Sequence, residues 1–239
     1  MHDIDNKNIS LVIDALNKHN VDFWLDHGTL LGYVREKELI PWDTDFDISV
    51  WKNDYDKLDE SFISIFLSEG WTVYIGKEKI KLFPLNYEQI MDIDIGRYSM
   101  EGDETYLTYL IRNESKFAKI SVAIIKTMGT QGKDKYRRVV QLKDKSITAF
   151  IIALVFTKTL NILPKSMRMR ITGIMDNKVR TIRRVTVPRE LLEPLIKVVF
   201  INREVSIPEN HEAYLEFKYG PDWRMPRKEY RGITDFLTK

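Results

Sequence analysis

The sequence predicts an α/β protein in which helices and strands alternate along most of its 239 residues. Three observations lead to this class. The N-terminal segment carries apolar side chains at helical spacing, short runs rich in aliphatic and aromatic residues follow it, and two apolar runs near the C-terminus enclose a short turn. Elements of both kinds in alternation form a sheet with helices packed on it.

Most strand signals lie in the first hundred residues. Residues 4–19 place Ile9, Val12, Ile13 and Leu16 on one helix face. The elements expected after this helix are, in order, a strand at Val21–Leu25, a turn that opens a short helix at Gly28–Gly32, a strand at Phe46–Val50, a helix at Asp54–Leu67, and strands at Trp71–Ile75, Ile80–Phe83 and Ile90–Ile95.

The second part of the chain predicts more helix. Residues 105–145 indicate a mostly helical region. The apolar run Ile147–Phe156 is shorter than the roughly 20 residues of a bilayer span, so we expect a buried or an interfacial helix there. A strongly basic stretch follows. The last expected elements are a hairpin around Asn202, made by Leu195–Phe200 and Glu204–Ile207, and a helix at Glu209–Lys218.

These elements suggest a single domain over residues 1–239. Within it we expect a sheet core at about 1–100, a mostly helical basic and apolar region at about 105–190, and a C-terminal hairpin, helix and Tyr-Gly motif at about 191–239. The helical region is thus an insertion before the C-terminal hairpin.

The composition excludes several classes of protein. Hydrophobic residues make up 44% and charged residues 30%, which is typical of a globular protein. The net charge is only +2, and no long basic groove with interleaved aromatics is visible, so nucleic acid is not an expected partner. The absence of cysteine excludes disulfides and thiolate zinc sites. Because the N-terminus also lacks the apolar core of a secretory signal, we expect a cytoplasmic location.

Three aspartates alternate in the segment Ile40–Val50. Residues two apart in a strand share a face and lie on the order of 7 Å apart, so Asp43, Asp45 and Asp47 line one side. Their repulsion raises each pKa unless a cation neutralises the cluster. Because hard divalent cations prefer oxygen ligands and phosphates, the row predicts a metal–diphosphate site. The alternative is an acidic loop that caps a helix and binds no ligand.

Other polar residues extend this hypothesis. Asp92 and Asp94 share one face of the strand predicted at 90–95, which predicts a further metal ligand on a neighbouring strand. An ordinary half-solvated strand shows the same pattern. Arg35 can contact phosphate, although an arginine at such a position also fits a surface ion pair.

Two groups of residues near the two ends of the chain form recognisable motifs. They are Phe23–Gly32 with Arg35 and Ile40–Ile48, and Tyr214–Gly220 with Trp223 and Pro226. Together they resemble the signature of the LicD family, which includes bacterial phosphocholine transferases and the animal proteins fukutin and fukutin-related protein. The resemblance is weak between about 100 and 190.

The resemblance implies a nucleotidyltransferase-type mixed sheet flanked by helices, and transfer of a phospho-substituent that depends on Mg²⁺, with Mn²⁺ as a substitute. By position, Asp45 and Asp47 match the metal pair and Asp43 the acid before it. Asp94, with Asp92 in reserve, matches the third acid. The residues that match the donor site are Asp26, Gly28, Thr29 and Arg35. His27 replaces a usually small residue, and its role is open.

The implied donor is a cytidine-diphosphate conjugate of choline, ribitol or glycerol, and the implied acceptor is a glycan or lipid-linked sugar, as in the modification of teichoic acid or capsule. An acceptor hydroxyl attacks the phosphorus distal to the nucleoside and expels cytidine monophosphate, with Asp45, Asp47 and Asp94 as catalytic residues. Two alternatives remain open: transfer of the nucleoside monophosphate with release of pyrophosphate, and a non-catalytic relative that binds glycan or membrane.

The stretch between Lys158 and Arg189 contains one acid, Asp176, among many basic residues. The basic residues are Lys165, Arg168, Arg170, Lys178, Arg180, Arg183 and Arg184. Apolar residues are interspersed, which predicts peripheral contact with the anionic cytoplasmic face of a membrane. The equally good alternative is a helix that packs on the core with a solvated basic face.

Overall fold

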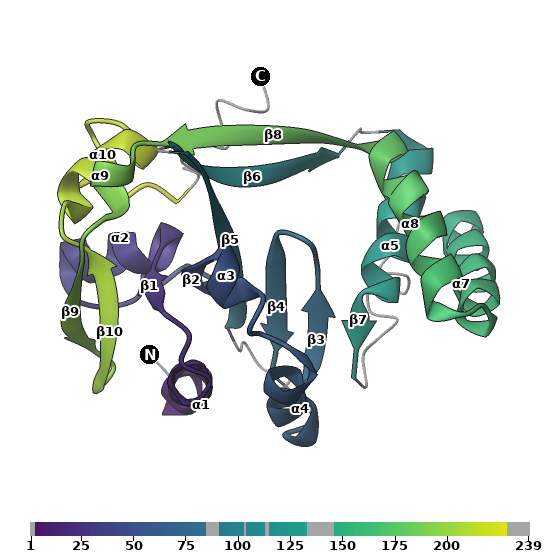
Figure 1. Ribbon diagram of the computed structural model, residues 1–239, viewed down its shortest axis with the longest axis horizontal. Coiled ribbons are helices and arrows are strands. Elements are labelled where there is room, and N and C mark those ends of the chain that lie inside the picture. The colour runs from purple at the N-terminus through teal and green to yellow at the C-terminus, as the bar shows by residue number, and fades with distance from the viewer. Residues whose placement is uncertain (1–2, 85–90, 103, 113–114, 133–145, 229–239) are drawn as a thin grey trace.

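A computed structural model describes residues 3–84, 91–102, 104–112, 115–132 and 146–228. Its centre is a mixed sheet with the strand order β1-β2-β5-β4-β3-β7, to which β6 and β8 are added through β5 (Figure 1). The bounds of these strands are β1 Phe23–Leu25, β2 Asp45–Trp51, β3 Thr72–Ile75, β4 Lys79–Phe83, β5 Asp92–Glu101, β6 Glu104–Arg112, β7 Thr130–Gln131 and β8 Arg180–Val187.

Helices cover the sheet and its two ends. Their bounds are α1 Asp3–Lys18, α2 His27–Glu36, α3 Lys52–Tyr55, α4 Glu60–Ser68, α5 Lys116–Met128, α7 Ile147–Ile162, α8 Lys165–Val179, α9 Arg189–Leu192 and α10 His211–Tyr219. A separate hairpin of β9 Leu195–Phe200 and β10 Arg203–Pro208 lies beside β1 and α2. The predicted α/β class, a mixed sheet flanked by helices, is confirmed, and a hairpin and a helix follow near the C-terminus as expected.

Strand β5 organises the sheet. Its first half runs parallel to β2 and antiparallel to β4, whereas its second half pairs with β6. The pairing of β2 with β5 is the parallel one among the described strands; the others are antiparallel. The first half of β5 therefore lies between two other strands, with its side chains held at fixed positions on each face.

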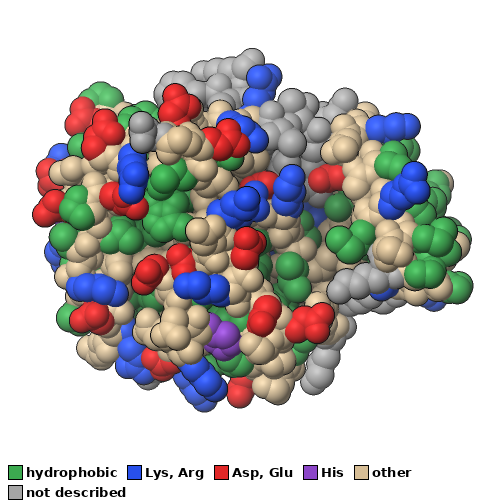
Figure 2. Space-filling view, viewed as in Figure 1, with side chains coloured by type: hydrophobic (Ala, Val, Ile, Leu, Met, Phe, Trp, Pro, Cys, Tyr) green, Lys and Arg blue, Asp and Glu red, His purple; other side chains and the backbone are tan. Residues whose placement is uncertain are grey.

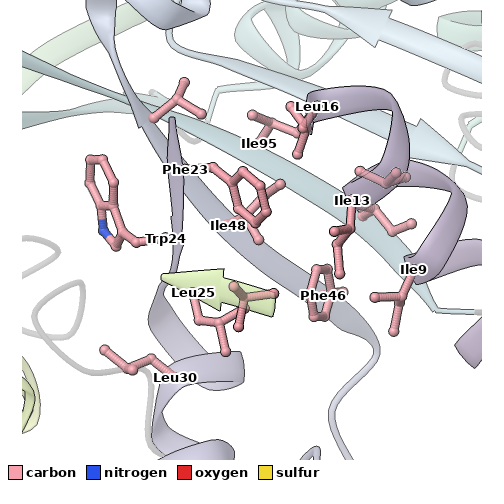
Figure 3. Close-up of a cluster of buried hydrophobic side chains, with 14 of the residues drawn as sticks. Ile9, Ile13, Leu16, Phe23, Trp24, Leu25, Leu30, Phe46, Ile48 and Ile95 are labelled. Atoms are coloured by element: carbon pink, nitrogen blue, oxygen red, sulfur yellow. The ribbon is translucent and has the colours of Figure 1, made fainter. Parts of the chain in front are cut away.

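The main core lies between the sheet and the N-terminal helix. Ile9, Ile13 and Leu16 of α1 pack toward Phe46 and Ile48 of β2 (Figure 3). All five side chains are at most 1% exposed. The predicted helical spacing of residues 4–19 and the apolar alternation of β2 are thereby explained, because each buries one face against the other.

The C-terminal elements follow the sequence prediction closely. The hairpin turn consists of Ile201 and Asn202, with φ of 50° and 55°, as a two-residue loop between twisted antiparallel strands requires. Helix α10 packs against α2 and β10, so the closing motif of the chain lies beside the turn that precedes α2 (Figure 1).

Two predictions of helix are wrong. The helix expected at Asp54–Leu67 is two helices, α3 and α4, because Asp59 caps the second one by accepting from the backbone N–H groups of Ser61 and Phe62. The mostly helical region at 105–190 also contains β6 and β8, which pair with each other along their full lengths. This pairing joins segments about seventy residues apart, so local sequence did not reveal it. Residues 133–145 of that region, and Ile90 of the predicted fifth strand, lie outside the described residues.

Helices α5, α7 and α8 form a group at the end of the molecule opposite the hairpin (Figure 1). Ala153 and Leu160 of α7 pack with Ile124 of α5 in a second, smaller core. The predicted helix at Ile147–Phe156 is thus confirmed, and it extends to Ile162. Among the described residues, no helix has the length and hydropathy to cross a bilayer.

Candidate functional site

The parallel register of β2 and β5 brings four aspartates to one face of the sheet. Asp45 lies opposite Asp92, and Asp47 lies opposite Asp94. Carboxylate oxygens of Asp45, Asp47 and Asp94 lie within 4.8 Å of one another, and these three form the one acidic group in the described part of the chain that can surround a cation. Asp92 is not in the group, although it lies opposite Asp45 at the start of β5.

Burial and mutual repulsion make this cluster electrostatically unfavourable as it stands. Burial, followed by the negative charges of Asp45 and Asp94, raises the pKa of Asp47 well above its ordinary value. Burial and the neighbouring Asp45 raise the pKa of Asp43 to about 6. Burial is the largest cause of both shifts, and repulsion between the carboxylates adds to it. A cation bound among these carboxylates would favour their charged forms.

Asp94 differs from the other two acids because lysines already compensate its charge. The Lys79 ammonium lies 2.6 Å from Asp94 Oδ2, and the Lys81 ammonium lies 2.9 Å from Oδ1. Strand β4 supplies both lysines, since residues two apart share its face and Lys81 lies directly opposite Asp94. The predicted third acid therefore sits between two positive charges and the Asp45–Asp47 pair.

Asp43 precedes β2 and lies against Gly28 in the first turn of helix α2. A Cβ atom added to Gly28 would lie 2.1 Å from Asp43 Oδ2 and 3.9 Å from Asp47 Oδ2. Only glycine permits this approach of a carboxylate to the start of α2. The structure thus brings Asp43, Asp45, Asp47 and Gly28 together, as the sequence predicted, although Asp43 is outside the group of three.

Asp26 and Thr29 are buried members of the predicted donor site. Asp26 is fully buried, and Thr29 is 1% exposed; neither lines the cavity described below. The Thr29 hydroxyl oxygen accepts a hydrogen bond of 2.8 Å from the Asp47 backbone N–H. In this structure the two side chains are therefore buried at the start of α2 and beside β2, and their predicted contact with a donor stays a prediction.

A buried network surrounds the Asp26 carboxylate. It accepts hydrogen bonds from the His27 backbone N–H, the Ser49 hydroxyl, the Tyr214 hydroxyl and the Lys218 ammonium, at 2.6–2.7 Å. Burial opposes the charge on Asp26, but the attraction of Lys218 and His27 and these hydrogen bonds lower its pKa below the ordinary value. Tyr214 and Lys218 belong to α10, so the closing motif of the chain fixes Asp26, the N-cap residue of α2, through two hydrogen bonds.

His27 begins α2 in the left-handed region, with φ of 45°. Its side chain is 30% exposed and lines the cavity, and its Nε2 lies 3.6 Å from Asp26 Oδ2. Burial, followed by the charge of Lys218, lowers the pKa of His27 to about 4, so the ring is neutral at physiological pH. A neutral imidazole can donate or accept a hydrogen bond at the cavity wall without adding positive charge.

Arg35 also lines the cavity. Its side chain is only 6% exposed and pairs with Glu36 at 2.7 Å. Its buried Nε has no hydrogen-bond partner among the described residues, although such groups are usually satisfied. An anion in the cavity is the kind of ligand that would satisfy it.

A cavity of about 840 Å³, a size typical of small-molecule sites, lies at this site. It is bordered by His27, Gly28, Arg35, Asp43, Asp45, Asp47 and Asp94. Its other walls carry aromatic rings from the two sequence motifs and positive charges that sequence reasoning missed. They are Lys77, Lys79, Lys81, Lys126, Arg227 and Lys228, with Trp42 and Trp223. In Figure 2, positive and negative side chains gather together near the middle of the molecule. The alternation of Lys77, Lys79 and Lys81 was the available signal, because it repeats the two-residue spacing of the aspartates.

Comparisons with known proteins agree with the fold and the first motif. Residues 20–119 match the LicD/FKTN/FKRP nucleotidyltransferase domain family, so the predicted resemblance is confirmed for this part of the chain. Residues 20–119 contain β1 to β6 and all nine acidic and donor-site residues that were predicted from the sequence.

Three curated proteins illustrate the similarity. The Ribitol-5-phosphate transferase FKTN of Homo sapiens is 40% identical over 47 residues, which are 20% of this chain and 10% of that protein. The Ribitol 5-phosphate transferase FKRP of Homo sapiens is 40% identical over 43 residues, 18% and 9% of the two chains. Uncharacterized protein RP689 of Rickettsia prowazekii is 38% identical over 60 residues, 25% and 22%. This chain thus spans less than a quarter of each relative's length.

Among solved structures, the antibiotic-resistance factor ANT(2'')-Ia in solution matches 74% of this chain and 98% of its own, with a TM-score of 0.34 and 10% identity.

Proposed function

Because residues 20–119 match the LicD/FKTN/FKRP nucleotidyltransferase domain family, we propose that the protein is a metal-dependent transferase of a phospho-substituent. The group transferred is of the phosphocholine, ribitol phosphate or glycerol phosphate type. The donor is its cytidine-diphosphate conjugate, and the acceptor is a hydroxyl of a sugar, a glycan or a lipid-linked sugar.

One observation carries this proposal. Three carboxylates that meet within 4.8 Å stand at the wall of a cavity whose other walls carry lysines and arginines. A diphosphate donor needs both features, since a divalent cation binds carboxylate and phosphate oxygens together and further positive charges hold the remaining phosphate oxygens. The similarity to two ribitol-phosphate transferases supports the same reaction class.

The residues present fit Mg²⁺, with Mn²⁺ as a substitute. All the donor atoms are carboxylate oxygens, which are the ligands that hard divalent cations prefer, and three of them meet within 4.8 Å. Asp45 and Asp47 would hold the ion, with Asp94 completing the group. When bound, the ion supplies charge neutralisation to the diphosphate and to the leaving group.

The protein's own groups would position the metal ligands and the donor. The Thr29 hydroxyl fixes the backbone at Asp47, and Gly28 leaves room for Asp43. Lys79 and Lys126 lie at the cavity wall where they can reach phosphate oxygens. Trp42, 39% exposed, offers a face on which a cytosine ring can stack.

The reaction balances as a single displacement. The acceptor oxygen forms a bond to the phosphorus distal to cytidine, the bond from that phosphorus to the bridging oxygen breaks, and cytidine monophosphate leaves with the electron pair. The hydroxyl proton passes to a cavity carboxylate. Both Asp94 oxygens already face lysine ammonium groups, which favours an electrostatic role for Asp94 over the role of proton acceptor.

A binding experiment tests the site without knowledge of the acceptor. Mn²⁺ binding is followed by electron paramagnetic resonance for the wild type, Asp45→Asn and Asp47→Asn. Thermal shifts are then recorded with Mg²⁺ and cytidine diphosphate-choline, -ribitol or -glycerol. We expect the wild type to bind Mn²⁺ and to be stabilised by one conjugate in the presence of metal only. Equal Mn²⁺ affinity in all three proteins would contradict the proposed site.

A further inference from the structure

Helix α7 has a second apolar face that the protein itself does not cover in the described structure. Ile147, Ile151, Val155 and Ile162 recur at intervals that place them on one side of the helix. Their exposed fractions are 66%, 52%, 59% and 84%. Ile152 and Phe156 flank this stripe and are 50% and 42% exposed. We call these six side chains the α7 face.

The fold does not explain the α7 face. The opposite side of the helix, with Ala153, Thr157 and Leu160, is buried and already packs toward α5. A helix needs one apolar stripe to join a core, with polar residues on its other side. An α7 that is apolar on both sides therefore exposes more hydrophobic surface than packing requires, and such a patch marks an interaction surface.

Charge identifies the partner. Helix α7 contains no acidic residue, and the one charged residue on it, Lys158, is basic. The neighbouring α8 exposes Arg170 and Lys178, and β8 exposes Arg183. Figure 2 shows lysine and arginine side chains beside hydrophobic ones at the end of the molecule where Figure 1 places α7 and α8. An apolar stripe bordered by cations complements anionic headgroups above acyl chains.

Length decides how the helix would lie. At 16 residues, α7 is shorter than the roughly 20 residues of a transmembrane helix, and its opposite side is occupied by α5. We propose that the α7 face inserts parallel to the surface of an anionic membrane, with the basic residues of α7, α8 and β8 at the headgroups. This surface is separate from the candidate transferase site and does not depend on its activity.

Vesicle co-sedimentation tests the proposal with the full chain. Vesicles of phosphatidylcholine alone are compared with vesicles that also contain phosphatidylglycerol, at low and at high salt. We expect binding to the anionic vesicles that weakens at high salt. Ile151→Gln with Val155→Gln should weaken it at least about tenfold, because their side chains no longer favour the acyl region. Arg170→Gln with Lys178→Gln should weaken it about fivefold for each charge removed.

A matched control comes from the hairpin at the other end of the molecule. Val199 is 71% exposed and Lys197 is also exposed. The variant Val199→Gln with Lys197→Gln therefore replaces one exposed apolar and one exposed basic side chain with glutamine, away from α7. This variant should bind vesicles like the wild type.

Equal sedimentation with neutral and anionic vesicles, or wild-type binding by the α7 variant, would overturn the proposal. So would a concentration-dependent dimer, seen by sedimentation velocity, that the α7 variant abolishes while vesicles bind neither protein. That result would mean that a second copy of the chain covers α7.

Discussion

The Lys218 ammonium donates a hydrogen bond of 2.6 Å to the Asp26 carboxylate, although 192 positions separate the two residues. Both side chains are at most 4% exposed. Tyr214 joins the pair: its hydroxyl donates to Asp26 and receives hydrogen bonds from Lys218 and from Tyr98. The two sequence motifs of the chain thus meet in one buried network, directly behind the turn at the candidate site.

Breaking this pair should cost much stability. Lys218→Met or Asp26→Asn leaves a buried charge without its partner, so each should lower the free energy of unfolding by about 3–5 kcal/mol. The double variant should cost clearly less than the sum of the two. Urea unfolding measures all three. Arg203→Met is the control, because Arg203 pairs with Asp14 on the surface and should cost at most about 1 kcal/mol. Additive single effects would show that Asp26 and Lys218 are not coupled.

The same pair predicts how stability depends on pH. The pKa of Asp26 is lowered below its ordinary 3.8, so the native protein keeps the carboxylate charged where the unfolded chain binds a proton. Its contribution is therefore complete above pH 3.8 and is lost as the pH falls further. The pKa of Lys218 is also lowered, mainly by burial. The stability gap between wild type and Asp26→Asn should shrink on acidification below about pH 4; a constant gap would contradict this.

Gly28→Ala should damage the site without unfolding the protein. The added Cβ would lie 2.1 Å from Asp43 Oδ2, so the carboxylate must move. We expect weaker Mn²⁺ binding and at least about a tenfold loss of transferase activity. Gly173→Ala is the control: its Cβ meets nothing within 4 Å in helix α8, so alanine should leave activity unchanged and add up to about 1 kcal/mol of stability. Equal behaviour of the two variants would remove Gly28 from the site.

Neutralising Asp47 and neutralising Asp94 should change the thermal stability of the metal-free protein in opposite directions. Asp47→Asn removes a repelled charge and should raise Tm, by about 2–4 °C for each kcal/mol gained. Asp94→Asn leaves Lys79 and Lys81 without their shared partner and should lower Tm. Both should abolish Mg²⁺-dependent activity, whereas Asp92→Asn should be mild. A differential scanning calorimetry series in chelator gives the Tm values, and a rise of Tm in Asp94→Asn would contradict the lysine pairing.

Local patterns predicted the parts of the fold that local contacts determine. The alternation of aspartates with Phe46 and Ile48 placed β2 correctly, because the apolar face packs on α1 and the acidic face meets the cavity. The hairpin around Asn202 was also predicted correctly, because its two strands and its turn are adjacent in the sequence. The resemblance supplied the roles of Asp45, Asp47 and Asp94, which remain predictions until they are tested.

Long-range contacts account for most of what the sequence did not predict. Strands β6 and β8 were expected as helix. Among the described strands, β8 pairs only with the distant β6, and β6 pairs with β8 as well as with β5. The burial of Asp26 was not predicted, because nothing local shows that Tyr214 and Lys218 bury it. Lys79 and Lys81 were missed even though their two-residue spacing places both on the face of Asp94.

The most direct measurement of the central claim is the identity of the small product. The protein is incubated with Mg²⁺, a panel of glycan acceptors and each cytidine-diphosphate conjugate, of choline, ribitol or glycerol, and products are followed by phosphorus NMR. We predict cytidine monophosphate and an equal amount of phosphodiester on the acceptor, with at least about a hundredfold less from Asp45→Asn or Asp47→Asn. Release of pyrophosphate from cytidine triphosphate, or undiminished product from both variants, would contradict the account.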